Sequence, residues 1–449
     1  MIVASNWQKT IAWTGRNGVY LLYNILLLLL ALPVLAGHLL HGLLRGRRRH
    51  GVRERFGYYA QERLAPLAGK KTVWIHAVSV GETQAAAPLV KALKSRYPDW
   101  AVVLTNVTET GHRVATGING VDLCLYFPYD FAWTVRRAFV QVKPALVVVV
   151  ETEIWPNFMR TAHRTGVPAV LVNGRISDRS FPRYRRLRFL IKPVLRQFSR
   201  LCMQSAVDAQ RIEAMGAPAE RIEVTRNLKF DMQAGGLNEQ NPAPIRKKYG
   251  IPADSRVLVA GSTHAGEEEQ VVGVYRRLLK SHPDLCLVLV PRHPDRCRVV
   301  GELLSSHNLP FSLRSELEDA PVTMAPGAVL LVDTVGELLQ FYAVADLIFV
   351  GGSLVPVGGH NILEAALLKK PVLFGPYMHN FKDISRLLVK AGGGLVISEG
   401  EEFYRIASTL LADSERCQDM GAKGYALLQD NRGATERTLQ AIEQIMEAG

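Results

Sequence analysis

Short apolar runs alternate with longer amphipathic stretches along most of this chain. Runs rich in β-branched residues occur over residues 72–78, 101–107, 145–151 and 167–173, and helix-like sequence such as 83–98 separates them. Strands that alternate with helices at this spacing indicate βαβ units and a parallel sheet. The first half of the chain is therefore predicted to form an α/β domain.

The alternation is interrupted near Gly235, where "QAGGLNEQNPAP" is polar and rich in residues that break helices and strands. It restarts beyond this stretch, with apolar runs over residues 256–263, 285–293, 329–334, 346–353 and 370–376. The pattern predicts two Rossmann-like α/β domains that face a cleft, over residues 51–235 and 236–449.

The N-terminal region has a different character. The segment Val19–Leu44 is apolar over a length that could span a membrane, and "RGRRRH" follows it directly. Because the heavier positive charge follows the apolar segment, we expect an uncleaved anchor with the bulk of the chain in the cytoplasm. The segment could span the bilayer or lie in its interface, and a buried core helix is the simpler alternative. Residues 1–50 are thus predicted to be a membrane anchor with a basic flank.

Composition and charge narrow the choice of partners. The chain has 449 residues, of which 48% are hydrophobic and 21% charged, which is typical of globular domains. Its net charge of +13 favours nucleic acid, anionic lipid or a phosphorylated substrate. The five cysteines are scattered, which indicates reduced thiols in a cytoplasmic compartment.

Much of this charge is concentrated in the segment 175–200. It contains nine Arg or Lys residues with interleaved Phe and Leu, and Asp178 is its only acidic residue. Such a surface is typical of binding to anionic lipid. Nucleic acid is the competing partner, but the chain has no RNP, KH or helix-turn-helix pattern.

Ligands of open parallel sheets bind beyond the carboxyl ends of the strands, so residues directly after the apolar runs are candidates for chemistry. Glu82, in "HAVSVGET", lies at a predicted helix start, where the helix dipole would lower its pKa and leave it ionised and able to accept a proton. The alternative is a first-turn Glu that only complements the dipole. Glu151 follows four valines and needs a partner. Lys229 could stabilise negative charge or be a solvated surface lysine.

The second domain contains a candidate nucleotide site in "FVGGSLVPVGGHNILEAALLKKPVLFGP". Gly358 and Gly359 would let the backbone approach a ligand, and a helix starting near Asn361 would offer free N–H groups to a phosphate. Glu364 could accept hydrogen bonds from ribose hydroxyls, or could merely complement the helix dipole.

Three other strand ends of this domain carry polar groups: Pro291, Arg292 and His293; Val335, Gly336 and Glu337; and His264 with Glu267. An arginine at such a position suits a phosphate, whereas Glu267 or Thr263 could simply cap a helix. The chain has no Walker A, GxGxxG, DxD or HExxH motif, which favours a nucleotide site without a metal.

The motifs "RERFG", "HAVSVGET", "ETEIWPN", "NLKFD", "GSTHAGEEE", "LVLVPRHP", "DTVGEL", "FVGGSLVPVGGHNILEAA" and "FGPYMHNFKD" occur in this order from about Arg53 to the C-terminus. Together they resemble the 3-deoxy-D-manno-octulosonic acid (Kdo) transferases of Gram-negative lipopolysaccharide synthesis. The resemblance implies a GT-B fold and inverting, metal-independent transfer without a cofactor. It implies that Kdo moves from CMP-Kdo to a glucosamine hydroxyl of the lipid A precursor, at the cytoplasmic side of the bacterial inner membrane.

The resemblance also assigns roles to individual residues. It places the general base on Glu82, and it makes Glu151 and Lys229 stabilisers of the charged transition state. It assigns CMP contacts to Pro291 and Arg292, to Val335, Gly336 and Glu337, and to Asn361, Ile362, Leu363 and Glu364.

Two other functions compete with this one. Another membrane-surface GT-B enzyme, such as a lipid A disaccharide synthase, would use a UDP-sugar. A non-catalytic membrane adaptor would read nucleotide or nucleic acid through its basic face, but it would have no need of polar groups at so many strand ends.

Overall fold

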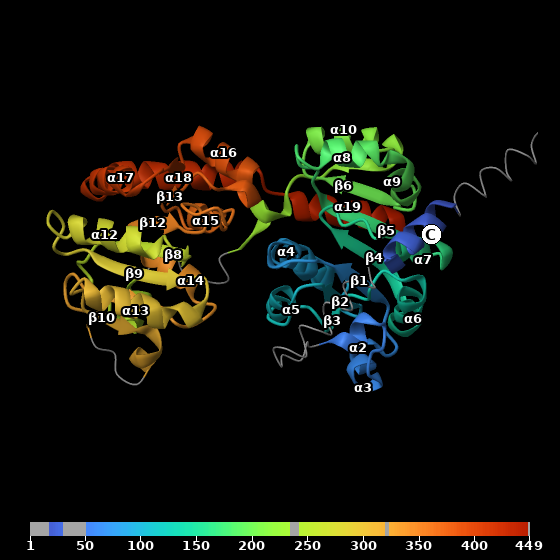
Figure 1. Ribbon diagram of the computed structural model, residues 1–449, viewed down its shortest axis with the longest axis horizontal. Coiled ribbons are helices and arrows are strands. Elements are labelled where there is room, and N and C mark those ends of the chain that lie inside the picture. The colour runs from blue at the N-terminus through green and yellow to red at the C-terminus, as the bar shows by residue number, and fades with distance from the viewer. Residues whose placement is uncertain (1–17, 30–50, 234–241, 319–322, 448–449) are drawn as a thin grey trace, which may run out of the picture. The chain divides into compact units, whose positions relative to one another are not determined.

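The protein is represented by a computed structural model that describes residues 18–29, 51–233, 242–318 and 323–447. The chain divides into two compact α/β units (Figure 1). Unit 1 comprises Met1–Asp231 and Arg432–Gly449, and unit 2 comprises Met232–Asn431.

Unit 1 is built on a seven-stranded sheet in the order β3-β2-β1-β4-β5-β6-β7, and every pair of neighbouring strands is parallel. The strands are β1 (Thr72–His76), β2 (Ala101–Asn106), β3 (Leu123–Tyr126), β4 (Pro144–Val150), β5 (Ala169–Gly174), β6 (Arg200–Met203) and β7 (Ile222–Val224). Because the strand order reverses between β1 and β4, the carboxyl ends of these two strands form the switch point where ligands bind in such sheets.

Helices cover both faces of this sheet. Those of unit 1 are α2 (Val52–Arg55), α3 (Gln61–Leu64), α4 (Val80–Arg96), α5 (Glu109–Ala115), α6 (Ala132–Val142), α7 (Pro156–Arg164), α8 (Phe181–Arg186), α9 (Arg188–Leu195), α10 (Ala206–Ala214) and α19 (Ala434–Glu447). Trp74 packs with side chains of α6, α7, α9 and α10, whereas its neighbours Val73 and Ile75 pack with α4, α5 and α19. Successive strand residues point to opposite faces, so a strand covered on both sides is apolar throughout.

Unit 2 repeats the design with a second parallel sheet, in the order β10-β11-β9-β8-β12-β13-β14. Its strands are β8 (Val257–Thr263), β9 (Cys286–Pro291), β10 (Phe311–Leu313), β11 (Val329–Leu331), β12 (Leu347–Val350), β13 (Val372–Phe374) and β14 (Gly394–Val396). Its helices are α11 (Ala243–Lys248), α12 (Glu268–Leu278), α13 (Cys297–Ser306), α14 (Leu338–Val344), α15 (Leu363–Leu367), α16 (Lys382–Ala391), α17 (Gly400–Ala412) and α18 (Ser414–Asp430). Here the switch point lies between β8 and β12.

The predicted parallel α/β architecture is confirmed, and each of the nine apolar runs named above overlaps a strand. Five strands were not predicted: β3, β6, β7, β10 and β14. They have only three or four residues each. Three strands of the same length, β11, β12 and β13, were predicted because they are followed by glycine, proline or polar residues that mark the end of an apolar run.

The predicted second domain, 236–449, is wrong at its C-terminal end. The chain returns to unit 1 after Asn431, and α19 packs into the core of unit 1 through residues such as Leu439 and Ile442. Asp231, the last residue of the first pass through unit 1, accepts hydrogen bonds from the backbone N–H groups of Gly433 and Thr435. An amphipathic helix pattern does not specify which sheet the helix covers, so local sequence could not reveal this return.

The predicted anchor lies mostly outside the described residues. Within 18–29 the chain is helical, and among the residues that the structure describes no helix has both the length and the apolar character needed to cross a bilayer. The predicted anchor in residues 1–50 is therefore not confirmed.

Candidate active site

Glu82 lies in the first turn of α4, which follows the carboxyl end of β1. Ser79 is the N-cap of this helix and accepts a hydrogen bond from the Glu82 backbone N–H. In return, the Glu82 carboxylate accepts hydrogen bonds from the Val78 N–H (2.7 Å) and the Ser79 hydroxyl (2.8 Å). This reciprocal arrangement is a variant of the capping box. It holds the carboxylate in one orientation at the edge of the sheet.

The pKa of Glu82 differs from the sequence prediction. We expected the helix dipole to lower it, but burial of the side chain, followed by the charge of Glu151, raises the pKa to about 7. The hydrogen bonds from Val78 and Ser79 oppose this rise without cancelling it. Burial prevailed because the carboxylate is only 8% exposed and lies beside two other carboxylates, those of Glu151 and Glu153. A carboxylate with a pKa near 7 is suited to proton transfer at neutral pH.

Glu151 and Lys229 form an ion pair at the neighbouring strand end. The Lys229 Nζ lies 3.2 Å from Glu151 Oε1, and both side chains are largely shielded from solvent. Lys229 belongs to the short 3₁₀ helix Leu228–Asp231, which Asn173 at the end of β5 holds through the Leu228 N–H. The predicted triad thus assembles at the ends of β1, β4 and β5.

Glu151 has a strained backbone, with φ of +57°. A non-glycine residue whose backbone adopts the left-handed conformation costs free energy. Such residues cluster at functional sites, where the surrounding structure holds them. Its backbone N–H donates to the carbonyl of Val172, which fixes the turn at the end of β4. This conformation directs Glu151 away from the line of the strand.

The basic segment 175–200 contains two short helices. α8 ends and α9 begins on either side of Leu187. α8 follows the carboxyl end of β5. The pKa of its Tyr184 is raised, first by burial and second by the negative charge of Glu153. α9 leads to the start of β6.

In unit 2, hydrogen bonds to Glu267 hold the glycine-rich loop after β12 in place. The buried carboxylate of Glu267 accepts hydrogen bonds from the backbone N–H groups of Gly352, Ser353 and Leu354, and also from that of His264. Glu267 therefore joins the loops at the two strand ends of the switch point. Glu267 therefore has a structural role. The alternative given above, that it only caps a helix, is also structural but does not include its hydrogen bonds to the loop after β12.

Gly358 and Gly359 serve packing rather than open access. Both have positive φ, of +116° and +75°. A Cβ at Gly358 would lie 2.4 Å from Asn380 Nδ2, and one at Gly359 would lie 2.2 Å from Met378 Sδ. The glycines are needed because the segment around residues 378–380 lies against the loop.

Asn361 and Glu364 are adjacent at the start of α15. The Asn361 side chain accepts from the Leu363 N–H and donates to Glu364 Oε1. Burial raises the pKa of Glu364 to about 7, against the lowering effects of Asn361 and Arg292. The helix expected to begin near Asn361 begins at Leu363 and has only five residues, so its dipole is small. A phosphate here would depend on side chains.

The side chains available to a phosphate are an arginine and three histidines, at the ends of β8 and β9 and in the loop after β12: Arg292, His264, His293 and His360. The Nε2 atoms of His264 and His360 lie 2.9 Å apart, and the His293 ring packs edge-on against that of His264. Burial, then the charges of Arg292 and the two other histidines, lowers the pKa of His360 to about 3. His264 and His293 were candidates from the sequence, because each follows an apolar run, whereas His360 follows the double glycine and was not.

The predicted contact residues Val335, Gly336 and Glu337 behave differently from one another. Val335 is 82% exposed, and a Cβ built at Gly336 would have no neighbouring atom within 4 Å. Burial alone would raise the pKa of Glu337, but hydrogen bonds from Thr334, Arg314 and Tyr249 lower it to about 2. The Glu337 carboxylate is thus committed to protein donors, and only the neighbouring backbone is open.

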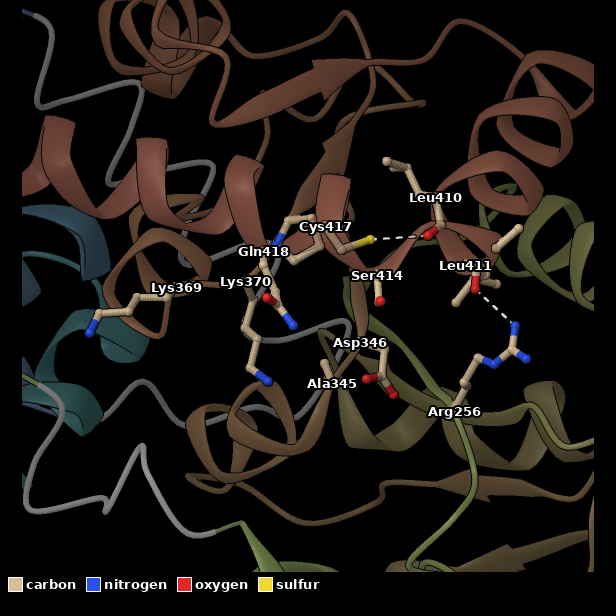
Figure 2. A pocket seen from close by; sticks show the side chains of 12 residues that line it. Arg256, Ala345, Asp346, Lys369, Lys370, Leu410, Leu411, Ser414, Cys417 and Gln418 are labelled. Carbon is tan, nitrogen blue, oxygen red and sulfur yellow. Dashed lines mark hydrogen bonds between the residues drawn. The ribbon is translucent and has the colours of Figure 1, made fainter.

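A cavity of unit 2 lies at the other edge of its sheet (Figure 2). It is lined by residues that precede strands, including Arg256 before β8 and Asp346 before β12, and Arg256 donates to the Leu411 carbonyl. Because Arg292 and Asn361 follow strands, this cavity is separate from the candidate nucleotide site.

Comparison with solved structures identifies the class of fold. The chain is similar to the Staphylococcus aureus MnaA–UDP co-structure, with a TM-score of 0.56, 19% identity, and coverage of 84% of this chain and 97% of the other. It is also similar to a glycosyltransferase from Rickettsia africae, with a TM-score of 0.55, 14% identity, and coverage of 85% and 100%. The two parallel-sheet α/β domains are of the kind found in GT-B glycosyltransferases.

Sequence comparison identifies the family. The family described as 3-Deoxy-D-manno-octulosonic-acid transferase matches residues 50–232. The 3-deoxy-D-manno-octulosonic acid transferase of Haemophilus influenzae is 35% identical over 403 residues, which cover 89% of this chain and 92% of the relative. The Bordetella pertussis enzyme of the same name is 35% identical over 415 residues, covering 89% and 94%. The chain belongs to the Kdo transferase family and is a glycosyltransferase.

Proposed function

We propose that this enzyme transfers Kdo from CMP-Kdo to the lipid A precursor, a tetra-acylated disaccharide bisphosphate, in lipopolysaccharide synthesis. The observation that carries the catalytic part is the grouping of Glu82, Glu151 and Lys229 at the switch point of unit 1. A buried carboxylate with a pKa of about 7 beside a lysine–carboxylate pair suits deprotonation of a hydroxyl.

Glu82 acts as the general base. Its carboxylate takes the proton of the acceptor glucosamine hydroxyl while that oxygen attacks the anomeric carbon of Kdo. The bond between this carbon and the phosphate oxygen breaks, and CMP leaves with the bonding electron pair. A single displacement inverts the configuration at the carbon. Lys229, held by Glu151, stabilises the negative charge that develops.

Unit 2 holds the nucleotide. Arg292 at the end of β9 binds the phosphate of CMP, and Pro291 lies beside it. Asn361 and Glu364 bind the ribose, with Ile362 and Leu363 contributing backbone, and the open backbone of Val335 and Gly336 lies at a third strand end. Glu337 keeps this third loop in place through its contacts with Arg314 and Tyr249.

The acceptor is an anionic lipid, so we further propose that the enzyme works at the cytoplasmic side of the bacterial inner membrane. Residues 1–50 attach it, and the basic segment 175–200 attracts phosphorylated lipid. This proposal is supported by the net charge of +13 and by the exposed leucines of residues 18–29.

The test is transfer of labelled Kdo, generated in place as CMP-Kdo, to the tetra-acylated lipid A precursor. We expect product with the wild type, and a loss of roughly 10²–10⁴-fold with Glu82→Gln. Retained CMP binding by the variant would show that the loss is catalytic. A comparable rate in the variant would make Glu82 a capping residue only.

Donor specificity separates this function from its nearest competitor. CMP, and not UDP, should raise the melting temperature of the enzyme, since bound ligand stabilises the native state. Stabilisation by UDP alone would favour a UDP-sugar transferase instead. Stabilisation by neither nucleotide, together with full function of Glu82→Gln, would favour a non-catalytic adaptor.

A further inference from the structure

A groove in unit 1 collects positive charge away from the candidate active site. It has a volume of about 990 Å³ and is lined by α7, α9, α10 and the segment that follows α10. Six Lys or Arg residues line it, against two Glu: Arg160, Arg164, Arg188, Lys192, Arg196 and Arg221, with Glu213 and Glu220.

The groove lies towards the amino edge of the sheet. Arg164 ends α7, Arg196 follows α9 and Gly216 follows α10, and helices that connect parallel strands end near the start of the next strand. Glu82 and Glu151 lie at the opposite, carboxyl edge, so the length of β4, β5 and β6 separates them from the ends of these helices. The groove is therefore too far from the carboxylates to hold the reacting hydroxyl.

The cations of the groove are held in place by the fold. Gly216 has φ of +108°, and a Cβ there would lie 2.7 Å from Lys192 Cγ, so the lysine stem lies directly on the backbone. Arg221 donates to the carbonyls of Arg196 and Phe198, which shapes the turn after α9. In the described part of the chain, no ion pair involves Arg164, Arg188 or Lys192.

The helical residues 18–29 border this groove. Tyr20 lines it, beneath the guanidinium of Arg160, and its hydroxyl accepts a hydrogen bond from the Gln197 side-chain amide. Further along the same face, Tyr23 donates to the buried Asp130, and Asn24 pairs with Asn157. The polar residues of this helix thus face the domain.

The apolar residues of the same helix face outward. Six of its aliphatic side chains are exposed, Leu21 to 64% and the others to between 43% and 60%: Leu21, Leu22, Ile25, Leu26, Leu28 and Leu29. On α9, Phe189 is 60% exposed beside the groove. An outward apolar face next to a cationic groove is the arrangement of a surface that inserts side chains into a bilayer and contacts its headgroups.

We infer that this groove binds the headgroup phosphate of an anionic phospholipid, while Leu21, Ile25 and Leu28 enter the acyl region. The occupant is a phospholipid of the bulk membrane rather than the acceptor, because the groove is remote from Glu82. This inference deepens the membrane attachment proposed above, and its test needs no sugar transfer.

The experiment measures binding of the full chain to two kinds of vesicle at the same salt concentration. One kind is phosphatidylcholine alone, and the other contains 30% phosphatidylglycerol. Arg188→Gln with Lys192→Gln should weaken binding to the anionic vesicles by roughly tenfold or more, since each cation near an anionic surface strengthens binding severalfold. Binding to neutral vesicles should not change. Leu21→Ser with Leu28→Ser should weaken binding to both kinds of vesicle.

The matched control is Arg113→Gln with Arg136→Gln, which removes the same charge from exposed positions elsewhere in unit 1. An equal loss of binding in this control would mean that only net charge matters, and would contradict the assignment of the groove as the phospholipid site. A second measurement is the KM for the acceptor in detergent micelles without phospholipid. If only the variant with Arg188→Gln and Lys192→Gln has a raised KM, the acceptor itself occupies the groove, and the inference is overturned. Failure of transfer in the wild type would leave the vesicle result unaffected.

Discussion

At the scale of single residues, the chemistry of the site depends on how far burial opposes local hydrogen bonding. Glu82 receives two hydrogen bonds and a helix N-terminus, all of which favour its charged form, yet its pKa is raised to about 7. Burial is the largest cause and Glu151 the second. The carboxylate is thus kept protonatable at a cost to the folded state.

That cost makes a prediction about stability. A carboxyl group whose pKa is about 7 when folded and 4.5 when unfolded favours folding at low pH and loses this contribution as pH rises through 7. Glu82→Gln removes the effect, so its advantage over the wild type should grow between pH 5 and pH 8, by up to about 3 kcal/mol. Urea unfolding at the two pH values measures this, and an equal difference at both would contradict it.

The same pKa sets the pH dependence of catalysis. The general base must be ionised, so kcat/KM of the wild type should fall as pH drops below about 7. Glu151→Gln removes a neighbouring negative charge and should move this acidic limb to lower pH, whatever it does to the maximum rate. An unmoved limb would mean that Glu151 does not act on Glu82.

At the scale of elements, the loops at strand ends carry most of the special backbone geometry. Glu151 and Ser262 have positive φ at the ends of β4 and β8, and Gly358 and Gly359 have it in the loop after β12. The buried carboxylate of Glu267 binds three successive N–H groups of that loop. The nucleotide loop is therefore held by the protein itself.

Gly358→Ala tests this packing. A Cβ at φ of +116° and 2.4 Å from Asn380 should destabilise the protein by about 2 kcal/mol or more. Gly273→Ala is the matched control, since Gly273 lies within α12 with nothing near its Cβ position. That substitution should stabilise by about 0.5–1 kcal/mol. Thermal unfolding distinguishes the two, and equal effects would contradict the packing argument.

The attachment of residues 18–29 makes a second prediction at this scale. Tyr23→Phe leaves Asp130 without one donor and should weaken docking of the helix by about 1–2 kcal/mol. Amide hydrogen exchange over residues 18–29 should then be faster than in the wild type. Tyr129→Phe, which changes an exposed tyrosine of the same unit, should leave it unchanged.

At the scale of the whole molecule, the chain passes through unit 1, then unit 2, and returns to unit 1 with α19. Ala434, Leu439 and Ile442 of that helix belong to the same core as Val73 and Ile75 of β1. The C-terminal residues therefore stabilise the unit that carries Glu82, although they follow unit 2 in sequence.

A variant that ends at Asn431 should show this dependence. Unit 1 loses an apolar surface cover and the two N–H groups bound by Asp231, so its thermal transition should fall or vanish. Stabilisation of unit 2 by CMP should persist. Calorimetry with and without CMP measures both, and loss of the unit 2 transition alone would contradict the assignment of α19.

Much of this protein follows from the sequence by itself. Apolar runs of five to seven residues, buried on both faces, predict the central strands and hence two parallel sheets, because each such run needs helices on both sides. Polar residues directly after those runs predict the candidate sites, because parallel strands end at one edge. Glu82, Glu151, Lys229 and Arg292 were found in this way.

Tertiary structure decided what depends on residues distant in the chain. The raised pKa of Glu82 comes from burial and from Glu151, which no local pattern reports. The return of α19 to unit 1, the meeting of His264 with His360, and the collection in one groove of cations from α7, from α9 and from the segments that follow α9 and α10 are likewise products of packing. Local sequence specifies which face of an element is apolar, but only the folded chain determines what that face and its charges meet.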